Sequence, residues 1–219
     1  VINGDGWKWQ KWSVNGDVKA ISENRLPSYK LVKKMNAEDV PLKDRIYNDT
    51  SRHFLRPTTI EFFLCKNVLI DGVKIMNSPL WCIHPVFSES ITIRNIMFDS
   101  QTVNSDGIDI ESSKNVIIEN NIFDNHDDNI ALKSGMNLEG RNGVNVTGTE
   151  LQHIKSHYVS ETKRLLGPTE NVKIRNCIFK GHYAFCIGSE LSGGIRNIDI
   201  RDCFAPMEVK MGIFIKGGR

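Results

Sequence analysis

The sequence lacks any long hydrophobic run, any large net charge and any closely spaced pair of cysteines. No apolar stretch approaches the roughly 20 residues that a transmembrane helix needs. The first residues, VINGDGWKWQ, lack the pattern of a secretion signal. A net charge of +2, with basic residues scattered along the chain, argues against a nucleic-acid-binding surface. We therefore expect neither a membrane nor a nucleic acid as a partner.

Metal-binding and disulfide-rich classes have little support either. The five cysteines are odd in number and none stands in a C-x-x-C pair, which argues against a zinc site. The spacing of Cys177 and Cys203 would permit a disulfide, but we expect buried thiols. His153 and His157 lie four residues apart and could face one metal ion from a helix, yet no third ligand is evident. The sequence predicts no metal and no other cofactor.

The chain does contain a repeated nine-residue pattern in which apolar and polar side chains alternate, as in a strand with one buried face. The copies NVLIDGVKI, SITIRNIMF, NVIIENNIF, NVKIRNCIF and NIDIRDCFA start at residues 67, 90, 115, 171 and 197. Successive starts are 23, 25, 56 and 26 residues apart, so the long step should contain an inserted loop. Aligned positions form columns: Val68, Ile91, Val116, Val172 and Ile198; Ile70, Ile93, Ile118, Ile174 and Ile200; Gly72, Asn95, Asn120, Asn176 and Asp202; and Ile75, Phe98, Phe123, Phe179 and Ala205.

Such columns are typical of a solenoid, in which each turn buries its apolar face only by stacking on its neighbours. We therefore predict an all-β fold, a parallel β-helix, with the asparagine column stacking at the bends through its side-chain amides. Composition does not change along the chain, so residues 1–219 should form a single domain. Loop excursions are expected at about 21–57, with one short helix near Met35, and at 136–169.

The two ends of the chain carry weaker signals. Trp7, Trp9 and Trp12 are expected in a strand of an early coil. The last strand pattern ends three residues before the C-terminus, with no cap for the apolar end of the coil. We therefore expect the solenoid to be truncated at one or both ends, as a fragment of a longer protein.

A second set of strand-like segments follows the first: WCIHP, IDIES, IALKS, FCIGS and IFIKG. Aligning their inward residues gives a column of Ile83, Ile110, Leu132, Ile187 and Ile215, with Ile60 one repeat earlier. The residues that follow should form a polar row on the outer surface: Glu61, His84, Glu111, Lys133, Gly188 and Lys216. Four residues before the column lie Asp106, Asp128, Tyr183 and Met211, and one residue earlier lie Asp127 and His182.

This alignment brings acids that are remote in sequence into one pocket. Parallel turns stack about 4.8 Å apart, so Asp106, Asp127, Asp128 and His182 should meet from three consecutive coils. Three carboxylates beside a histidine suit hydrolysis of a glycosidic bond, because like-charge repulsion raises the pKa of one carboxyl until it can hold a proton for the leaving oxygen. The others can orient and deprotonate water, and a water between acid and base is the inverting arrangement.

The ordered motifs around these residues resemble those of glycoside hydrolase family 28, the polygalacturonase-like enzymes. The similarity runs from about Arg56 to Lys216. It rests on NSDGID, HDDNIALKSG, GHY at 181–183, IGSE at 187–190 and IFIK at 213–216. It implies a right-handed parallel β-helix that hydrolyses a pectin-type polysaccharide by single displacement without a metal. It also implies a secreted or periplasmic protein, which we expect to be a monomer.

The resemblance also implies a role for each matched residue. It makes Asp127 the general acid, while Asp106 and Asp128 activate water. His182 would adjust the acid and touch the substrate, and Lys216 would bind a uronate carboxylate.

Three positions depart from the family pattern. His126 and Tyr183 replace glycines, the first before the paired aspartates and the second after the histidine, and Phe214 replaces an arginine. The missing arginine removes a bidentate partner for a carboxylate. A decorated or rhamnose-containing pectin, or another uronide, therefore competes with plain homogalacturonan as the expected substrate. His126, Tyr183 and His84 are further candidates for contact with the substrate.

Simpler interpretations stay open for the acids. Asp106 could cap a turn, because N-S-D-G is also good turn sequence, and the pair Asp127 and Asp128 could be a solvated bend. Asp109 is more simply structural, since alternation turns it away from the other acids.

The basic residues and the function have alternatives too. His84 and His182 could be satisfied histidines of the solenoid, which we favour for His84, and Lys133 is more simply a surface lysine. A calcium-assisted polysaccharide lyase would use the same coil, although its usual arginine base has no candidate here. A non-catalytic solenoid that binds glycan is the third possibility.

Overall fold

The structure is a computed structural model, which describes residues 1–12, 34, 35, 38, 40, 44, 56–135 and 167–217. Most of the two expected loop excursions, at about 21–57 and 136–169, and the histidine pair His153 and His157 lie outside the described residues. Within the described ranges, none of the helices has the length and apolar character of a membrane span.

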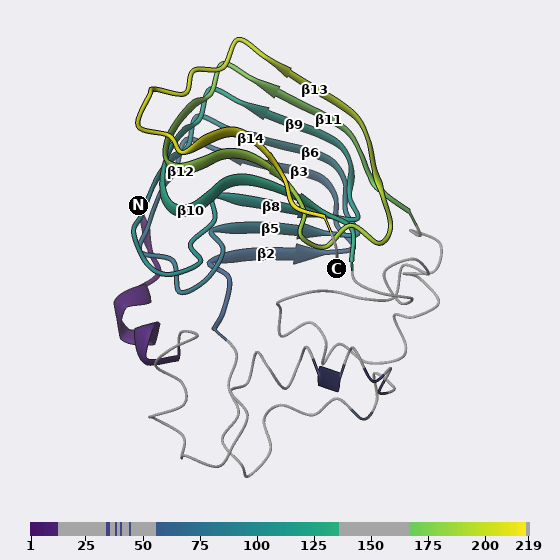
Figure 1. Ribbon diagram of the computed structural model, residues 1–219, viewed down its shortest axis with the longest axis horizontal. Coiled ribbons are helices and arrows are strands. Elements are labelled where there is room, and N and C mark those ends of the chain that lie inside the picture. Colours follow the sequence, from purple (N-terminus) through teal and green to yellow (C-terminus); the bar gives the residue numbers. More distant parts are fainter. Residues whose placement is uncertain are drawn as a thin grey trace.

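The described chain winds into a parallel β-helix with three strand-bearing faces (Figure 1). The first face contains β1 (Ile2–Asn3), β4 (Lys74–Met76), β7 (Met97–Ser100) and the first parts of β10 (Ile122–Lys133) and β12 (Ile178–Ile187). The second contains β2 (Ile60–Phe63), β5 (Ile83–Val86), β8 (Ile108–Glu111), the later parts of β10 and β12, and β14 (Met211–Ile215). The third, a separate sheet, contains β3 (Lys66–Asp71), β6 (Glu89–Arg94), β9 (Lys114–Glu119), β11 (Thr169–Arg175) and β13 (Ile195–Arg201).

The predicted apolar columns run along the axis of this coil and join equivalent residues of successive turns. In the third sheet, ladder pairs join the isoleucine column from Ile70 through Ile118 to Ile200 without a break. The phenylalanine column also stacks, with ring centroids of Phe98 and Phe123 4.6 Å apart and those of Phe123 and Phe179 5.4 Å apart. Each fully buried side chain of this size stabilises the fold by about 1.5–3 kcal/mol, so the column positions hold the coils in register.

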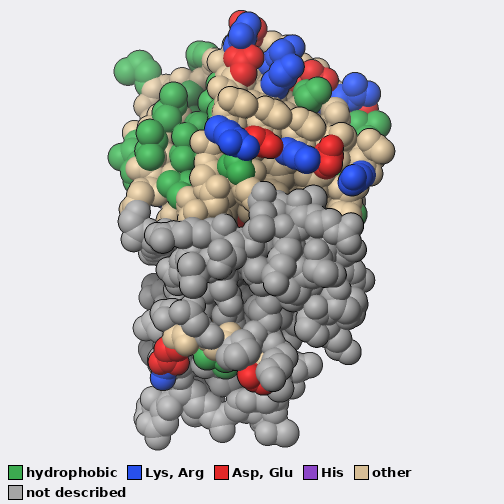
Figure 2. All heavy atoms as spheres, turned by 90° about the vertical axis from the view of Figure 1, so that its right-hand side faces the viewer, with side chains coloured by type: hydrophobic (Ala, Val, Ile, Leu, Met, Phe, Trp, Pro, Cys, Tyr) green, Lys and Arg blue, Asp and Glu red, His purple; other side chains and the backbone are tan. Residues whose placement is uncertain are grey.

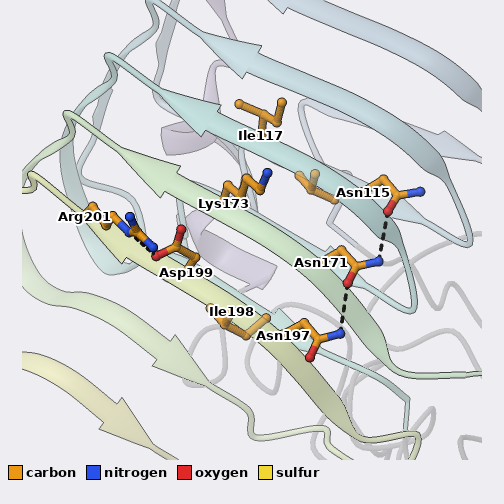
Figure 3. Close-up of a pocket in the computed structure, with 9 residues that line it drawn as sticks. Asn115, Ile117, Asn171, Lys173, Asn197, Ile198, Asp199 and Arg201 are labelled. Carbon is orange, nitrogen blue, oxygen red and sulfur yellow. Dashed lines mark hydrogen bonds and ion pairs between the residues drawn. The ribbon is translucent and has the colours of Figure 1, made fainter.

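Asparagines mark the bends for a conformational reason. In the predicted polar column, Asn95, Asn120 and Asn176 all have φ between 50° and 57°, a left-handed conformation that asparagine tolerates better than most residues. The predicted amide stacking occurs at a different bend (Figure 3), where Asn171 Nδ2 donates to Asn115 Oδ1 at 3.0 Å and Asn197 Nδ2 donates to Asn171 Oδ1 at 3.1 Å. The prediction had the right interaction at the wrong column.

These asparagines border a shallow pocket of about 710 Å³ on the outer face of the third sheet. Lys173, Asp199 and Arg201 also line it, and none of the predicted site residues does. Acidic and basic side chains are interspersed on the face seen in Figure 2, and ion pairs such as Lys66–Glu89 link neighbouring coils of the third sheet. On the described part of that face, charges of both signs alternate and no patch of a single sign forms.

Two local predictions were wrong. Ile83 pairs with Ile108 and not with Ile110. A slip of two residues preserves the alternation of inward and outward side chains, so hydrophobic pattern alone does not detect it. Residues Gly6–Trp12 form a 3-10 helix in place of a strand, and the three-residue step from Trp9 to Trp12 fits the three-residue turn of that helix.

The cysteines follow the prediction of buried thiols only in part, because Cys65 and Cys203 are partly exposed. All five lie within the described ranges and all are free thiols. Cys82, Cys177 and Cys186 are buried, and burial raises the pKa of the Cys82 thiol to about 12. These residues therefore act as small apolar side chains of the core.

Candidate active site

The centre of the candidate site is a carboxylate trio, Asp106, Asp127 and Asp128. One oxygen from each residue lies within 4.8 Å of the others. Asp106 lies in the turn before β8, and the other two lie in β10, where the pairing with β12 shifts register between Asn125 and Asp128. Such irregularities redirect side chains out of strict alternation. The stacked coils therefore bring together three acids that the sequence separates.

Asp106 occupies a tight and almost fully buried turn. Its exposed fraction is 4%, and the N–H of Gly107 donates to the backbone carbonyl of Asp128 at 2.9 Å. A Cβ at position 107 would collide with the backbone carbonyl of Asn129, so the turn requires glycine. Burial, followed by the charges of Asp109 and of the rest of the trio, raises the pKa of Asp106 well above its usual range. This environment favours a protonated Asp106.

Asp128 is buried and bound by a cation. Lys216 Nζ lies 2.8 and 2.6 Å from its two carboxylate oxygens, and the Cys186 thiol donates to Oδ1 at 3.0 Å. Although burial opposes the charged form, the hydrogen bond to Asp128 raises the pKa of Lys216. The lysine nitrogen also lies 5.3 Å from the ring centroids of Tyr183 and Phe214. The lysine that was predicted to bind uronate thus contacts a member of the trio.

Asp127 lies on the more open side of the trio. It is partly exposed, and its Oδ2 accepts a hydrogen bond from Asn104 Nδ2 at 3.3 Å. Burial lowers the pKa of the neighbouring His182, the charges of Lys210 and His126 lower it further, and the charge of Asp127 opposes them. The balance favours a neutral imidazole beside Asp127.

Four rings form an aromatic row next to this acid: His126, His182, Tyr183 and Phe214. Successive ring centroids are 5.2, 6.0 and 5.4 Å apart, and all four side chains are partly exposed. Tyr183 pairs with Asp128 in the ladder between β10 and β12, as the sequence spacing predicted. The structure therefore gathers two predicted substrate-contact residues, His126 and Tyr183, with the ring that replaces the family arginine.

His84 lies elsewhere and is fully buried. Its Nδ1 lies 2.9 Å from Glu61 Oε2 and its Nε2 lies 3.1 Å from Glu111 Oε2, and we call these three residues the His84 group. Burial lowers the pKa of His84, but the hydrogen bonds to Glu111 and Glu61 outweigh it and raise the pKa to about 9. Both ring nitrogens are engaged, which favours the structural interpretation of His84 over substrate contact.

The middle of the predicted polar row, His84, Glu111 and Lys133, is buried, so the expectation of a surface lysine at position 133 was wrong. Lys133 is 5% exposed, with Nζ 3.1 Å from Glu190 Oε2 and 3.3 Å from Asp109 Oδ1. Burial raises the pKa of Asp109 to about 7, against the opposing charges of Lys133 and His84. Glu190 belongs to the IGSE motif, but only the fold reveals that it and Lys133 form an ion pair.

Sequence reasoning also missed Asn104 and Arg56. Asn104 begins the NSDG motif, which was the available signal, and its side chain contacts Asp127. Arg56 stands at the edge of an expected loop, and its guanidinium donates to Asn104 Oδ1 at 2.8 Å. No periodic pattern points to Arg56, because it precedes the first strand of the second face.

The trio has the spacing of a possible cation site as well as of an acid-base site. The ammonium of Lys216 already contacts both oxygens of Asp128, and so supplies a positive charge to one of the three carboxylates. Together with the partly exposed Asp127, this arrangement suits proton transfer to a leaving group and activation of water.

Residues 44–216 match the model for Glycosyl hydrolases family 28, and the chain belongs to this family. The predicted family and the predicted right-handed parallel β-helix are thereby confirmed.

Two curated proteins of plant and bacterial origin are similar to this chain. A probable polygalacturonase of Vitis vinifera is 30% identical over 167 residues, which cover 75% of this chain and 30% of the relative. An exo-poly-alpha-D-galacturonosidase of Dickeya chrysanthemi is 24% identical over 212 residues, covering 90% of this chain and 30% of the relative. The chain thus spans about a third or less of the curated relatives' length.

A solved exopolygalacturonase from Thermotoga maritima superposes with a TM-score of 0.75 and 35% identity, covering 95% of this chain and 43% of that one. A family 28 exopolygalacturonase from Yersinia enterocolitica superposes with a TM-score of 0.60 at 19% identity, covering 87% of this chain and 28% of that one, and supports the fold alone.

Proposed function

We propose that the protein is a glycosidase that hydrolyses glycosidic bonds of a pectin-type polysaccharide containing uronic acid. The observation that carries this proposal is the meeting of Asp106, Asp127 and Asp128 within 4.8 Å on a family 28 β-helix. The names of the relatives, polygalacturonase and exopolygalacturonase, support pectin as the substrate class. The protein would act as a secreted or periplasmic monomer, and a single peak of monomer mass in size-exclusion chromatography would test the last point.

Asp127 serves as the general acid in this proposal. It is the most accessible member of the trio, so a leaving oxygen can reach it, and the neutral imidazole of His182 lies beside it. Asp128 accepts hydrogen bonds from Lys216 on both oxygens, which suits a carboxylate that orients and deprotonates water. Asp106 lies close enough to hold the same water.

The raised pKa of Asp106 makes it the rival candidate for the proton donor. Leaving-group dependence separates the two, because a substrate with a good leaving group needs no acid. If Asp127 is the acid, Asp127→Asn should retain most of its rate on an activated aryl glycoside but lose it on an oligosaccharide, whereas Asp106→Asn should lose both. The reverse pattern would exchange their roles.

The substrate should present an apolar sugar face as well as a carboxylate. Phe214 and Tyr183 form part of the aromatic row, and Lys216 is the remaining cation of the predicted uronate-binding pair. An aromatic wall favours stacking on a sugar ring over bidentate pairing with a carboxylate. We therefore include rhamnose-containing and decorated pectins beside homogalacturonan.

Release of reducing ends over a panel of pectins, rhamnogalacturonans and other uronides tests the proposal. Hydrolysis predicts new reducing ends, no product with unsaturated-uronide absorbance, and no loss of activity with chelator. Unsaturated products would establish a lyase, and binding without release would establish a glycan-binding solenoid. Either result would overturn the glycosidase.

A further inference from the structure

The geometry points to Arg56 as a positioning residue that aims the Asn104 amide at Asp127 and so fixes which oxygen of this acid carries the catalytic proton. This inference rests on the proposed function, since it assigns Arg56 a part in the work of the proposed general acid. It is carried by four hydrogen bonds between described residues and by the donor chemistry of the groups involved.

The guanidinium of Arg56 joins three successive turns of the coil. Nη1 donates to the backbone carbonyl of Val103 at 2.6 Å and to that of Pro79 at 3.0 Å. Nη2 donates to Asn104 Oδ1 at 2.8 Å. Positions 79 and 103 lie in equivalent connections of adjacent coils, before β5 and β8. Arg56 therefore clamps the turn that leads into Asp106 and holds its side-chain amide at the same time.

Arginine has donors only, which sets the direction of the Asn104 amide. The oxygen of the amide must face the guanidinium, so the Nδ2 group must face the other way. In that direction it donates to Asp127 Oδ2 at 3.3 Å. A lysine or glutamine at position 56 would not hold three acceptors in this fork geometry.

The amide in turn distinguishes the two oxygens of Asp127. Because Asn104 Nδ2 is a donor and a carbonyl oxygen accepts better than a hydroxyl oxygen, this contact favours an unprotonated Oδ2 and so places the proton for the leaving group on Oδ1. Asn104 itself has φ of 57°, a left-handed conformation that asparagine tolerates, and its side chain reaches Asp127 on the next coil. Loss of Arg56 frees the amide to rotate, so a share of molecules would present the wrong oxygen to the substrate.

The test compares Arg56→Gln with the parent on two substrates: an oligogalacturonide, and an aryl oligogalacturonide with a nitrophenyl leaving group. We expect kcat on the oligogalacturonide to fall by about 10- to 100-fold, the size of effect that misplaced reacting groups produce, with KM little changed. The loss on the aryl substrate should be several-fold smaller, because that leaving group departs without an acid. Arg94→Gln, which removes an arginine paired with Asp71 on the third sheet, is the matched control and should change neither rate.

A double-mutant cycle with Asn104→Ala tests whether Arg56 acts on Asp127 through Asn104. If Arg56 acts through Asn104, adding Arg56→Gln to the Asn104→Ala variant should cause little further loss of kcat. Additive losses, or equal losses on both substrates, would overturn the inference. Arg56→Lys, which keeps the positive charge, replaces Arg56→Gln if that variant fails to fold, and the same comparison applies.

Asp127→Asn, assayed in parallel, separates this inference from the function beneath it. Leaving-group dependence in Asp127→Asn but not in the Arg56 variants would remove Arg56 from the mechanism and leave the glycosidase intact. A parent protein that releases reducing ends from no member of the pectin, rhamnogalacturonan and uronide panel would overturn the proposed function and this inference with it.

Discussion

Two sets of largely buried acids lie along the same face of the β-helix and meet different electrostatic conditions. In the His84 group, one imidazole lies between two glutamates, at 2.9 and 3.1 Å. In the carboxylate trio, three acids meet within 4.8 Å, and among the described residues Lys216 is the cation in hydrogen-bonding contact with them. The first set places its cation between two acids, whereas the second sets three acids against one cation, which contacts only Asp128.

The difference indicates what each set is for. A buried ion pair that is well bonded costs little to keep but much to break. Like-charged acids in one pocket cost stability, and such a cost persists where it serves chemistry, because it holds a proton on a carboxyl near neutral pH. The raised pKa of His84 favours its charged form, whereas the raised pKa of Asp106 favours its neutral form. Substitutions in the two sets should therefore have opposite consequences.

The contrast between the two sets depends first on whether the carboxylate trio catalyses hydrolysis. Asp127→Asn should lower the rate of hydrolysis by about 10²- to 10⁴-fold, the usual contribution of a general acid. The measurement is kcat from release of reducing ends, on whichever pectin the parent cleaves. Asp124→Asn, three residues earlier in β10, is the matched control. A parent-like rate in Asp127→Asn would remove the assignment.

The His84 group is tested by removing its imidazole. His84→Gln should lower the free energy of unfolding by about 3–5 kcal/mol, because Glu111 and Glu61 would lose the charged ring that bonds both of them in a largely buried site. Urea unfolding at pH 7 measures the change, with His126→Gln as a partly exposed control. A loss below about 1 kcal/mol would mean that the buried group is not a stabilising ion pair.

The same group should give the fold a pH dependence of definite sign. The pKa of His84 is raised to about 9 in the folded state, above its value of about 6.5 in an unfolded chain. Its contribution to stability is therefore fully present below about pH 6.5 and is lost as pH rises through 9. Unfolding free energy measured from pH 6 to 9.5 should decline in the parent, and the decline should flatten in His84→Gln. An equal slope in both would assign the effect to other groups.

The smallest expected effect is a gain in thermal stability, in contrast to the loss expected for His84→Gln. Ionising Asp106 costs stability above its ordinary pKa of about 3.9, since the folded state raises that pKa. Asp106→Asn should remove this cost and raise Tm at pH 7 by about 2–4 °C, as a gain of roughly 1 kcal/mol does for a chain of this size, while hydrolysis falls. A lower Tm would show that Asp106 is a structural turn residue.

Much of the fold could be predicted because the same alternation of apolar and polar residues recurs in each repeat. The columns through Ile93, Ile118 and Ile174 follow from alternation that recurs in every coil. The register of β5 could not be predicted in the same way, because Ile108 and Ile110 are both apolar and both point inward. Only the backbone hydrogen bonds distinguish these two registers.

The candidate site could likewise be predicted only in part. Motif and spacing were sufficient to bring the trio and His182 to one place. They were not sufficient to show that Lys216 turns onto Asp128 or that Lys133 is buried, because a long side chain can reach in several directions and the sequence does not state what surrounds it. The role of Arg56 depends on three turns meeting at one guanidinium, which no local pattern encodes.

The anomeric configuration of the first product, followed by NMR during hydrolysis, tests the central claim most directly. We propose that Asp127 protonates the leaving oxygen while Asp106 and Asp128 direct water onto the sugar, so the product should appear with inverted configuration. The trio makes this a demanding test, because one oxygen from each acid lies within 4.8 Å of the others, whereas the carboxyl groups of inverting enzymes are usually roughly 6.5–9.5 Å apart. A product of retained configuration would require a covalent intermediate on one of these acids and would contradict the account.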